Sequence, residues 1–436
     1  MPCCYTCPSL IEAAEKGCID CVKFFIYKEA DRNKYGYTAL IYAIRGNHAE
    51  CAKLLVDKKV NLQDKDGRTA LMYAVENNCF EYVKLLIPRE ARLQNKEGKT
   101  ALMYAALRDY TDIIKLLVDK EVGLKDNYGK TALMYAAEND HIECVKLLVV
   151  KEANLQDKWG KSALMYAAEN GHYTCANLII HTVNLKDKNG KSALMYAAEN
   201  GHTECAKLIL YYKGAFLQDN NGMTALMYAV ENRRTECVKL LAAEEEYIKN
   251  NDGETALMRA VLRGDIDIVK LLISHRSSLQ DNNGETALMY AVLRGYTDIV
   301  SLLMEKEVSI KNNHGKTALM YATEYGRIGC VKLLVDKEVG LKDNYGKTAL
   351  MHAANNGHYK CIKLLVDKET GIKDNYGKTA LMYAVEKEQL KCVKLLIDKE
   401  IYLKDNNDKT ALNYAKNEEI HKLIQDYLKK NNISHV

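Results

Sequence analysis

The feature that most constrains this chain is a short motif, Thr or Ser followed by Ala and Leu, that recurs along almost its whole length. Successive copies lie 31 residues apart, except for one interval of 30 and one of 32 on either side of Ser192. The copies begin at Thr38, Thr69, Thr100, Thr131, Ser162, Ser192, Thr224, Thr255, Thr286, Thr317, Thr348, Thr379 and Thr410. Duplication of one supersecondary unit gives such a period, so the chain is predicted to be one array of repeats rather than about three globular domains.

One copy of the repeat predicts two short helices. Thr131 can cap the first helix, predicted over 132–139, because its hydroxyl can accept a first-turn N–H. The second helix is predicted over 143–149, and the segment that follows, Lys-Glu-Ala-Asn-Leu-Gln-Asp-Lys, is typical of a turn. Gly171 and Gly201 are expected to be left-handed caps that end the first helix in their copies. Helices this short are not stable alone, so each copy must pack against the next.

This pattern resembles the ankyrin repeat over about residues 8–430. The family's T-P-L-H-x-A-A corresponds to Thr-Ala-Leu-Met-Tyr-Ala-Ala at 131–137, its G-H-x-E-V-V-x-L-L to residues 201–209, and its D-x-x-G-x-T to residues 126–131. Ala replaces the family's Pro, Met replaces its His, and the period is 31 residues instead of 33. Aligning both helices places this deletion in the turn.

The resemblance implies an all-α ankyrin-repeat solenoid of helix-turn-helix units with shortened turn fingers, about 14 repeats of 31 residues. Residues 1–37 are expected to form an N-terminal capping repeat, 38–409 twelve internal repeats, and 410–436 a C-terminal capping repeat and tail. The array is expected to be weakest over 176–216, where one residue is lost near His181 and one is gained near Tyr211. A repeat is stabilised mainly by its neighbours, so a change of register weakens the interfaces on both sides.

Composition excludes several classes of protein. The 62 basic and 58 acidic residues give a net charge of +4, so bulk charge implies no nucleic-acid partner. No segment approaches the roughly 18 consecutive apolar residues of a membrane span, and the first ten residues do not form a secretory leader. Nine of the 14 cysteines recur at one position of the second helix, which favours buried, reduced thiols. A cytoplasmic monomer is expected, either free or associated with the cytoskeleton.

Four cysteines near the start of the chain have a spacing that superficially matches a zinc site. Cys4-x-x-Cys7 and Cys18-x-x-Cys21 resemble a four-thiolate pattern. However, Cys21 already occupies the recurring helix position, Cys18 occupies a turn position, and the segment between the pairs fits the first helix. The favoured interpretation is an ordinary cap with no metal and no other cofactor, and zinc binding through these four cysteines is the alternative.

The chain lacks the motifs of common enzymes, so it is predicted not to be an enzyme. It has no Walker loop, no dinucleotide-binding glycine motif, no nucleophile elbow, no zinc-protease motif and no kinase motif. The Tyr that follows Met in most copies is interpreted as a core ladder with its hydroxyl at the edge of the groove. The aspartates and lysines of the recurring Asp-Lys-Glu are interpreted as a solvated face with weak ion pairs, and the recurring His, such as His202, as a residue that stabilises a turn.

Residues that vary between copies are the candidates for binding. In ankyrin proteins, ligands contact the finger tips and the groove-facing end of the first helix. The tip residue before the finger glycine is aromatic at Tyr128, Trp159, Tyr345 and Tyr376, and rigid aromatic side chains are favoured contact anchors. Packing of Trp159 on a neighbouring finger is the alternative.

Two further sets of residues extend this candidate surface. The position after the finger glycine carries a row of basic residues that includes Lys161 and is interrupted by Glu254 and Glu285. A Leu-Arg pair replaces the usual Glu-Asn at the end of the first helix in three copies, at Leu107 and Arg108, Leu262 and Arg263, and Leu293 and Arg294. Such a surface would suit an extended protein ligand of mixed charge, and a solvated surface without a ligand is the alternative.

The resulting functional hypothesis is a non-enzymatic scaffold or adaptor that binds protein partners through its concave groove and finger tips. The near-identical copies are similar to the large ankyrin-repeat families of diplomonad protists, in which such arrays occur alone or beside kinase-like domains. That resemblance implies a kinase-associated or cytoskeletal role. The alternatives are an inhibitor that occludes a partner enzyme, such as a kinase, and a structural or cytoskeletal spacer.

Overall fold

The computed structural model describes residues 7–28, 32–58, 61–212, 214, 216–273 and 278–431. These residues form 27 α-helices and two 3-10 helices, and β-structure among them is limited to three isolated bridges. The predicted all-α fold is therefore confirmed. The chain divides into two compact units, Met1–Asn220 and Asn221–Val436, which are described separately. None of the helices in the described part of the chain is long and apolar enough to cross a membrane.

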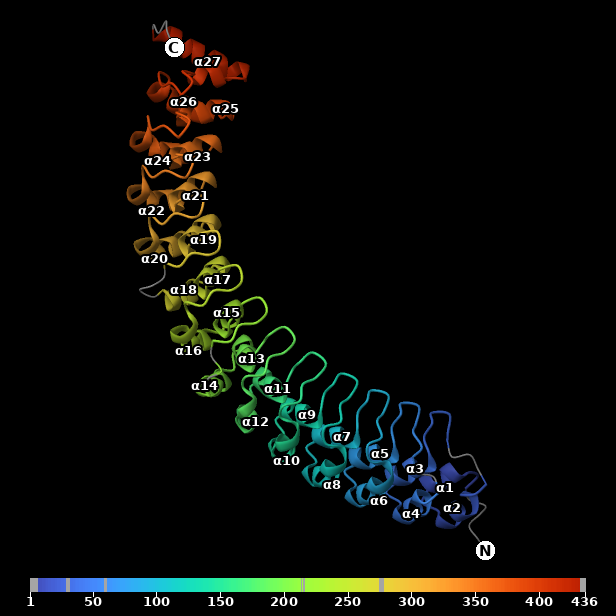
Figure 1. The fold of residues 1–436 in the computed structure, drawn as a ribbon. Coiled ribbons are helices and arrows are strands. Elements are labelled where there is room, and N and C mark those ends of the chain that lie inside the picture. The colour runs from blue at the N-terminus through green and yellow to red at the C-terminus, as the bar shows by residue number, and fades with distance from the viewer. Residues whose placement is uncertain are drawn as a thin grey trace. The chain divides into compact units, whose positions relative to one another are not determined.

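Each repeat contributes two antiparallel helices, here called helix A and helix B, and a finger that leads to the next repeat (Figure 1). The helices of the first unit are α1 Leu10–Glu15, α2 Ile19–Phe25, α3 Ala39–Arg45, α4 Ala49–Val56, α5 Ala70–Glu76, α6 Phe80–Glu90, α7 Ala101–Leu107, α8 Thr111–Glu121, α9 Ala132–Glu138, α10 Ile142–Glu152, α11 Ala163–Asn170, α12 Tyr173–Ile179, η1 Ile180–Thr182, α13 Ala193–Asn200 and α14 Thr203–Tyr211. Odd-numbered helices are helix A and even-numbered helices are helix B.

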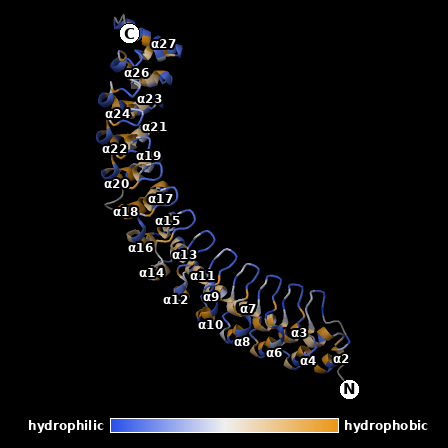
Figure 2. Ribbon diagram, viewed as in Figure 1, coloured by the Kyte–Doolittle hydropathy of each residue, from blue (hydrophilic) through white to orange (hydrophobic). Residues whose placement is uncertain are grey.

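The second unit continues the same alternation, except that in its last repeat a 3-10 helix is helix A and the last α-helix is helix B. Its helices are α15 Ala225–Glu231, α16 Thr235–Glu245, α17 Ala256–Arg263, α18 Ile266–Leu272, α19 Ala287–Arg294, α20 Thr297–Glu307, α21 Ala318–Glu324, α22 Ile328–Glu338, α23 Ala349–Asn355, α24 Tyr359–Glu369, α25 Ala380–Glu386, α26 Leu390–Glu400, η2 Ala411–Tyr414 and α27 Glu418–Lys430. Hydrophobic residues are concentrated in the helices of both units, and the fingers are hydrophilic (Figure 2).

Helix A begins where the sequence predicts. In α11, the Ser162 hydroxyl accepts the N–H of Met165, and Gly171 ends the helix with φ 77°. Gly201 does the same for α13 with φ 82°. The Ala-Leu-Met run of helix A is buried between neighbouring repeats, which explains why only small or flexible apolar residues recur there.

Helix B is longer than predicted. The second helix of the example repeat, α10, spans Ile142–Glu152 instead of 143–149, so its Lys-Glu end is helical. Glu152 is only 1% exposed, although the end of helix B on which it lies is polar. One carboxylate oxygen accepts the N–H of Leu133 in helix A at 2.7 Å, and the other accepts the N–H of Gly123 in the preceding turn at 2.7 Å.

This buried carboxylate recurs as a ladder through both units. The glutamates whose Oε2 accepts a helix A leucine N–H are Glu90, Glu121, Glu152, Glu245, Glu307, Glu338, Glu369 and Glu400. The N–H belongs to the first turn of helix A, which has no intrahelical acceptor, and a negative charge is favourable at that end of a helix. Each carboxylate therefore ties helix B to helix A, and most also bind the turn of the preceding repeat.

Glu307 differs from most other members of this ladder. Among the described residues, its Oε1 has no hydrogen-bond partner, whereas the Oε1 of Glu338 accepts the N–H of Ser309 at 2.7 Å. Burial raises the pKa of both carboxyl groups. With one fewer donor to offset the loss of solvent, burial raises the pKa of Glu307 to about 7.

The ladder is interrupted where the register changes. One residue is missing before Ser192, and the end of helix B becomes the 3-10 turn η1. Thr182 occupies the position of the ladder glutamate there, is buried, and donates its hydroxyl hydrogen to the carbonyl of Ile179. A threonine cannot bind the two N–H groups that a carboxylate bridges, so this repeat lacks the link that the preceding repeat has through Glu152.

We predict opposite effects on stability for Glu307→Gln and Glu338→Gln. Because the folded pKa of Glu307 is raised to about 7 from 4.5, the folded state binds its proton more tightly, and stability is lost as pH rises through that interval. Glu307→Gln puts a side chain there that is neutral at every pH, and it should therefore raise the free energy of unfolding at pH 8 by up to roughly 3 kcal/mol. At position 338, a Gln amide must turn its NH2 group toward an N–H, which costs about 1–3 kcal/mol.

Urea unfolding of the full chain at pH 5 and pH 8, with hydrogen exchange over α19 to α22, measures both effects. The prediction is contradicted if Glu307→Gln is no more stable than Glu338→Gln at pH 8.

We also predict that the amides of 176–212 exchange earlier than those of 120–160 and 340–380, because the repeat that ends at Thr182 lacks the carboxylate link. Native-state hydrogen exchange measures this difference. Equal protection in the three segments would show that the change of register has no energetic consequence.

Candidate partner-binding surface

Most of the described fingers are held in shape by one buried Asp or Asn side chain. In the finger that presents Tyr128, Oδ1 of Asp126 accepts the N–H groups of Tyr128 and Lys130 at 2.9 and 2.8 Å. Its Oδ2 accepts the hydroxyl hydrogen of Tyr135 in helix A at 2.6 Å. The recurring Tyr is therefore a core residue, as predicted, and its hydroxyl locks the finger onto helix A.

Neighbouring fingers are also joined by their backbones. The carbonyl of Tyr128 accepts the N–H of Lys158 at 2.8 Å, and the carbonyl of Trp159 accepts that of Lys188 at 2.9 Å. This bond requires a close approach, because a Cβ on Gly129, whose φ is +81°, would lie 2.6 Å from the nitrogen of Lys158. Glycine at position 129 therefore permits both the positive φ and the close approach of the next finger. The tips are presented at a fixed spacing by a hydrogen-bonded row.

The structure brings Tyr128 and Trp159 together on adjacent fingers. Their rings stack with centroids 5.8 Å apart and an interplanar angle of 16°. The predicted alternative for Trp159, packing on a neighbouring finger, is thus present, but it does not bury the pair: Tyr128 is 53% exposed and Trp159 51%. In the second unit, Tyr345 and Tyr376 lie on consecutive fingers and are similarly exposed.

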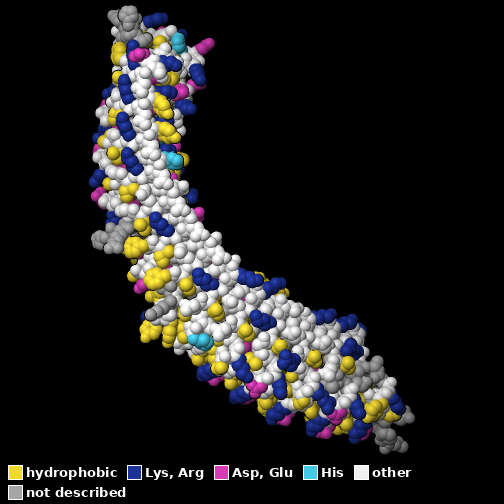
Figure 3. Space-filling model, viewed as in Figure 1, with side chains coloured by type: hydrophobic (Ala, Val, Ile, Leu, Met, Phe, Trp, Pro, Cys, Tyr) yellow, Lys and Arg dark blue, Asp and Glu magenta, His cyan; other side chains and the backbone are white. Residues whose placement is uncertain are grey.

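Lys161 is engaged within the array. Its ammonium pairs with Glu169 at 2.5 Å and lies 4.5 Å from the ring centroids of both Tyr166 and Tyr196. Equivalent pairs are Arg68–Glu76, Lys130–Glu138, Lys191–Glu199, Lys316–Glu324 and Lys378–Glu386. Basic side chains recur along the visible face of each unit (Figure 3), but the side chains that follow the finger glycine in these pairs are already neutralised by a helix A carboxylate.

The Leu-Arg pairs lie at the end of helix A, and their leucines are half-buried. Leu107 and Arg108 are in the first unit, where Arg108 is exposed. In the second unit, Leu262 and Leu293 are half-buried, and Arg294 is exposed. Arg263 pairs with Glu231 of the preceding repeat at 2.9 Å.

The acidic interruption of the basic row is also engaged. Glu254 pairs with Arg259 at 2.7 Å, and Arg259 in turn pairs with Glu231 at 2.5 Å. Glu285 accepts the hydroxyl hydrogen of Tyr321. These contacts explain why an arginine replaces the recurring Tyr at position 259. Because these charged side chains are paired within the array, the exposed aromatic tips are the better candidates for contact with a partner.

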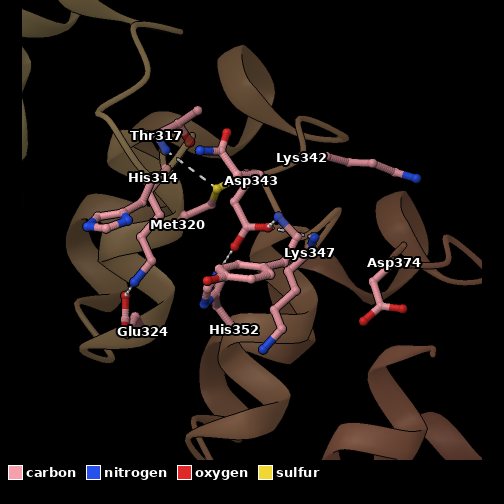
Figure 4. A network of polar contacts seen from close by, with 12 residues as sticks. His314, Thr317, Met320, Glu324, Lys342, Asp343, Lys347, His352 and Asp374 are labelled. Carbon is pink, nitrogen blue, oxygen red and sulfur yellow. Dashed lines mark hydrogen bonds and ion pairs between the residues drawn. The ribbon is translucent and has the colours of Figure 1, made fainter. Parts of the chain in front are cut away.

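His352, the other residue that replaces the recurring Tyr, also connects helix A to the finger, through an imidazole ring in place of a hydroxyl. Nε2 of His352 lies 3.0 Å from Oδ2 of Asp343, and Oδ1 accepts the N–H groups of Tyr345 and Lys347 (Figure 4). Burial by itself would raise the pKa of Asp343, but the hydrogen bond from His352 and those from the backbone lower it. The finger that carries Tyr345 is therefore fixed as firmly as its neighbours.

The recurring His residues have a role that their position in the sequence only partly indicates. The His48, His141, His172, His202 and His358 rings contact carbonyls of the preceding repeat, those of Glu15, Ala106, Glu138, Glu169 and Glu324 respectively, at 2.7–3.0 Å. They connect repeats instead of stabilising a turn alone. This contact supplies an inter-repeat side-chain bond in an array whose helix A carries Met in place of the family's His.

The suggested zinc cysteines are partly brought together. Cys7, Cys18 and Cys21 place their sulfur atoms within 4.8 Å of one another. Cys4 lies outside the described residues. The helix B cysteines of the later repeats, by contrast, are buried singly in the recurring position.

Comparison with known families agrees with this geometry. The family model described as ankyrin repeats (3 copies) matches residues 10–96, 84–156, 150–217, 212–279, 264–343, 336–407 and 370–434. The chain therefore belongs to the ankyrin-repeat family. A search of curated proteins found no match.

We predict that Gly129→Ala destabilises the array more than Gly123→Ala does. Both glycines have positive φ, +81° and +82°, so both substitutions carry a backbone strain of about 1–2 kcal/mol. Only Gly129 faces the next finger, whereas a Cβ at Gly123 has nothing within 4 Å. The clash should add about 1–3 kcal/mol. Thermal and urea unfolding measure the difference, and equal losses would show that the fingers do not need their close contact.

Proposed function

We propose that the protein is a non-enzymatic scaffold that binds protein partners through the finger tips and the adjoining groove face of helix A. The observation that carries this proposal is the stacked pair of Tyr128 and Trp159, which remains half exposed on fingers that are otherwise locked. Large aromatic side chains that are exposed and held rigidly lose little entropy on binding, and they are enriched among the residues that dominate interface energies.

The scaffold gains affinity from the order of its fingers. Asp126 and Asp157 fix the conformation of the two tip residues by accepting their N–H groups, at 2.9 and 2.8 Å. A partner therefore meets a preformed surface and does not have to order the loops. Tyr345 and Tyr376 provide a second, separate surface of the same kind in the second unit. Arg108 and Arg294 add exposed positive charge at the ends of their helices.

The proposed place of action is the cytoplasm. The cysteines of helix B are buried, and burial raises the pKa of several of them, for example that of Cys205 to about 11. Such thiols are protonated, unreactive core residues, which suits a compartment that keeps cysteines reduced.

We predict that Trp159→Ala weakens partner binding by roughly thirtyfold, since truncating a central aromatic anchor costs about 2 kcal/mol. Wild-type and variant proteins are immobilised, and the proteins that each captures from an extract of the source cells are quantified by mass spectrometry. Affinity for each captured protein is then measured with the purified pair.

The control is Asn189→Ala, which changes the exposed tip of the next finger and should leave binding intact. A second control, Lys146→Glu, changes the exposed outer face of α10. The proposal fails if Lys146→Glu abolishes binding while Trp159→Ala has no effect. Loss of activity in a single captured enzyme would identify an inhibitor in place of a scaffold.

A further inference from the structure

Three cysteine side chains meet in the first repeat. Cys7 precedes α1, Cys18 caps the start of α2, and Cys21 lies in the first turn of α2. Their sulfur atoms all lie within 4.8 Å of one another. Within the described ranges, this is the one group of three His, Cys, Asp or Glu side chains found close enough to share a metal ion. Cys7 and Cys21 are buried, and Cys18 is half-buried.

The repeat pattern does not account for this cluster. Cys18 occupies the position of His48 in the next repeat, whose ring bonds the carbonyl of Glu15 at 2.9 Å. A thiol is too short to make the equivalent contact. Cys7 likewise occupies the position of Tyr37. A cysteine recurs at the Cys18 position in Cys79, but the thiol of Cys79 donates to the carbonyl of Asn77 in its own turn, whereas Cys18 lies beside two other sulfur atoms.

The third thiol also has different surroundings from two of its equivalents. Cys144 donates to the carboxylate of Asp109 in the preceding repeat, with a sulfur–oxygen distance of 3.1 Å, and Cys175 makes the same bond to Asp140. Those cysteines have a structural hydrogen bond to a carboxylate. Cys21 instead faces two further sulfur atoms.

We propose that Cys7, Cys18 and Cys21 form a binding site for a thiophilic cation of the zinc class. Zinc binds thiolate sulfur at about 2.3 Å, so tetrahedral angles place ligand sulfurs about 3.8 Å apart. The three sulfurs, within 4.8 Å of one another, need only small side-chain rotations to reach that separation. Three protein ligands with a water in the fourth position is an arrangement that zinc accepts. The half-buried Cys18 leaves a path for the ion and the water.

A bound cation would fasten the start of the array. Cys7 lies before α1, whereas Cys18 and Cys21 lie at the beginning of α2, so one ion would join the segment that enters the first repeat to its second helix. Ions that bind only the folded state stabilise it, and thiolate ligands release protons when they bind. The site is independent of the finger surface, and the two proposals fail separately.

The test uses the full chain, purified under reducing conditions, freed of metal and titrated with Zn²⁺ alone. Wild-type protein is expected to take up about one ion per chain. Substitution with Co²⁺ should give the charge-transfer absorption of thiolate ligands. Cys18→Ser and Cys7→Ser should each abolish tight binding, while Cys361→Ser, which changes a buried helix B cysteine outside the cluster, should leave it unchanged.

Hydrogen exchange adds a readout that does not depend on the variants. Zn²⁺ should increase protection in α1 and α2 and leave α23 and α24 as they are. The proposal is overturned if wild-type protein takes up no zinc, if Cys18→Ser binds it as tightly as wild type, or if the cluster is recovered as a disulfide that excludes the metal.

Discussion

The structure depends on a buried carboxylate at the end of helix B. In each repeat that has it, one side chain accepts the N–H of a helix A leucine, and in most it also accepts an N–H from the preceding turn, as Glu121 does with Leu102 and Arg92 at 2.7 and 3.0 Å. Helices of about seven residues cannot persist alone. The carboxylate accepts an N–H at the start of helix A that has no acceptor within the helix. It also fixes the spacing between one repeat and the next, and the hydrogen bonds between neighbouring fingers depend on that spacing.

Burying this group has an energetic cost that its hydrogen bonds must offset. Loss of solvent raises the pKa of the Glu121 carboxyl, while hydrogen bonds from Leu102 and Arg92 act in the opposite direction. This balance explains why burial raises the pKa of the Glu307 carboxyl group, which lacks one of these hydrogen-bond donors, to about 7. The same balance explains why a change of register weakens a repeat. The carboxylate lies on helix B and its two N–H donors lie on helix A and in the preceding turn, so all three segments must keep fixed positions.

Much of the fold could be predicted from the sequence because the start and end of each helix A depend on a few neighbouring residues. The caps at Ser162 and Gly171 and the start of helix A follow from rules that concern a few neighbouring residues. The role of the buried glutamate could not be seen in this way, because the Asp-Lys-Glu segment in which it usually stands has the composition of a solvent-exposed helix end. A clue was present in the repeats themselves: glutamate is kept at this position when its neighbours change, as in Val150-Lys151-Glu152.

The candidate surface was predictable in part. The aromatic tips stand out as departures from a repeated pattern, and the structure places Tyr128 and Trp159 in contact while leaving both half exposed. The pairing of Lys161 with Glu169 could not be inferred from spacing alone, because it depends on how the finger folds back toward helix A. The convergence of Cys7 on Cys18 and Cys21 depends in the same way on the path of the chain before α1.

The most direct test of the central role of the carboxylate ladder is amide hydrogen exchange in Glu121→Ala. The account predicts that protection falls first at Leu102 and Arg92, the two N–H groups that Glu121 binds, and then through α7 and α8. Repeats two positions away should keep their protection, because repeats are stabilised by their immediate neighbours. Unchanged exchange at Leu102 and Arg92 would contradict the account.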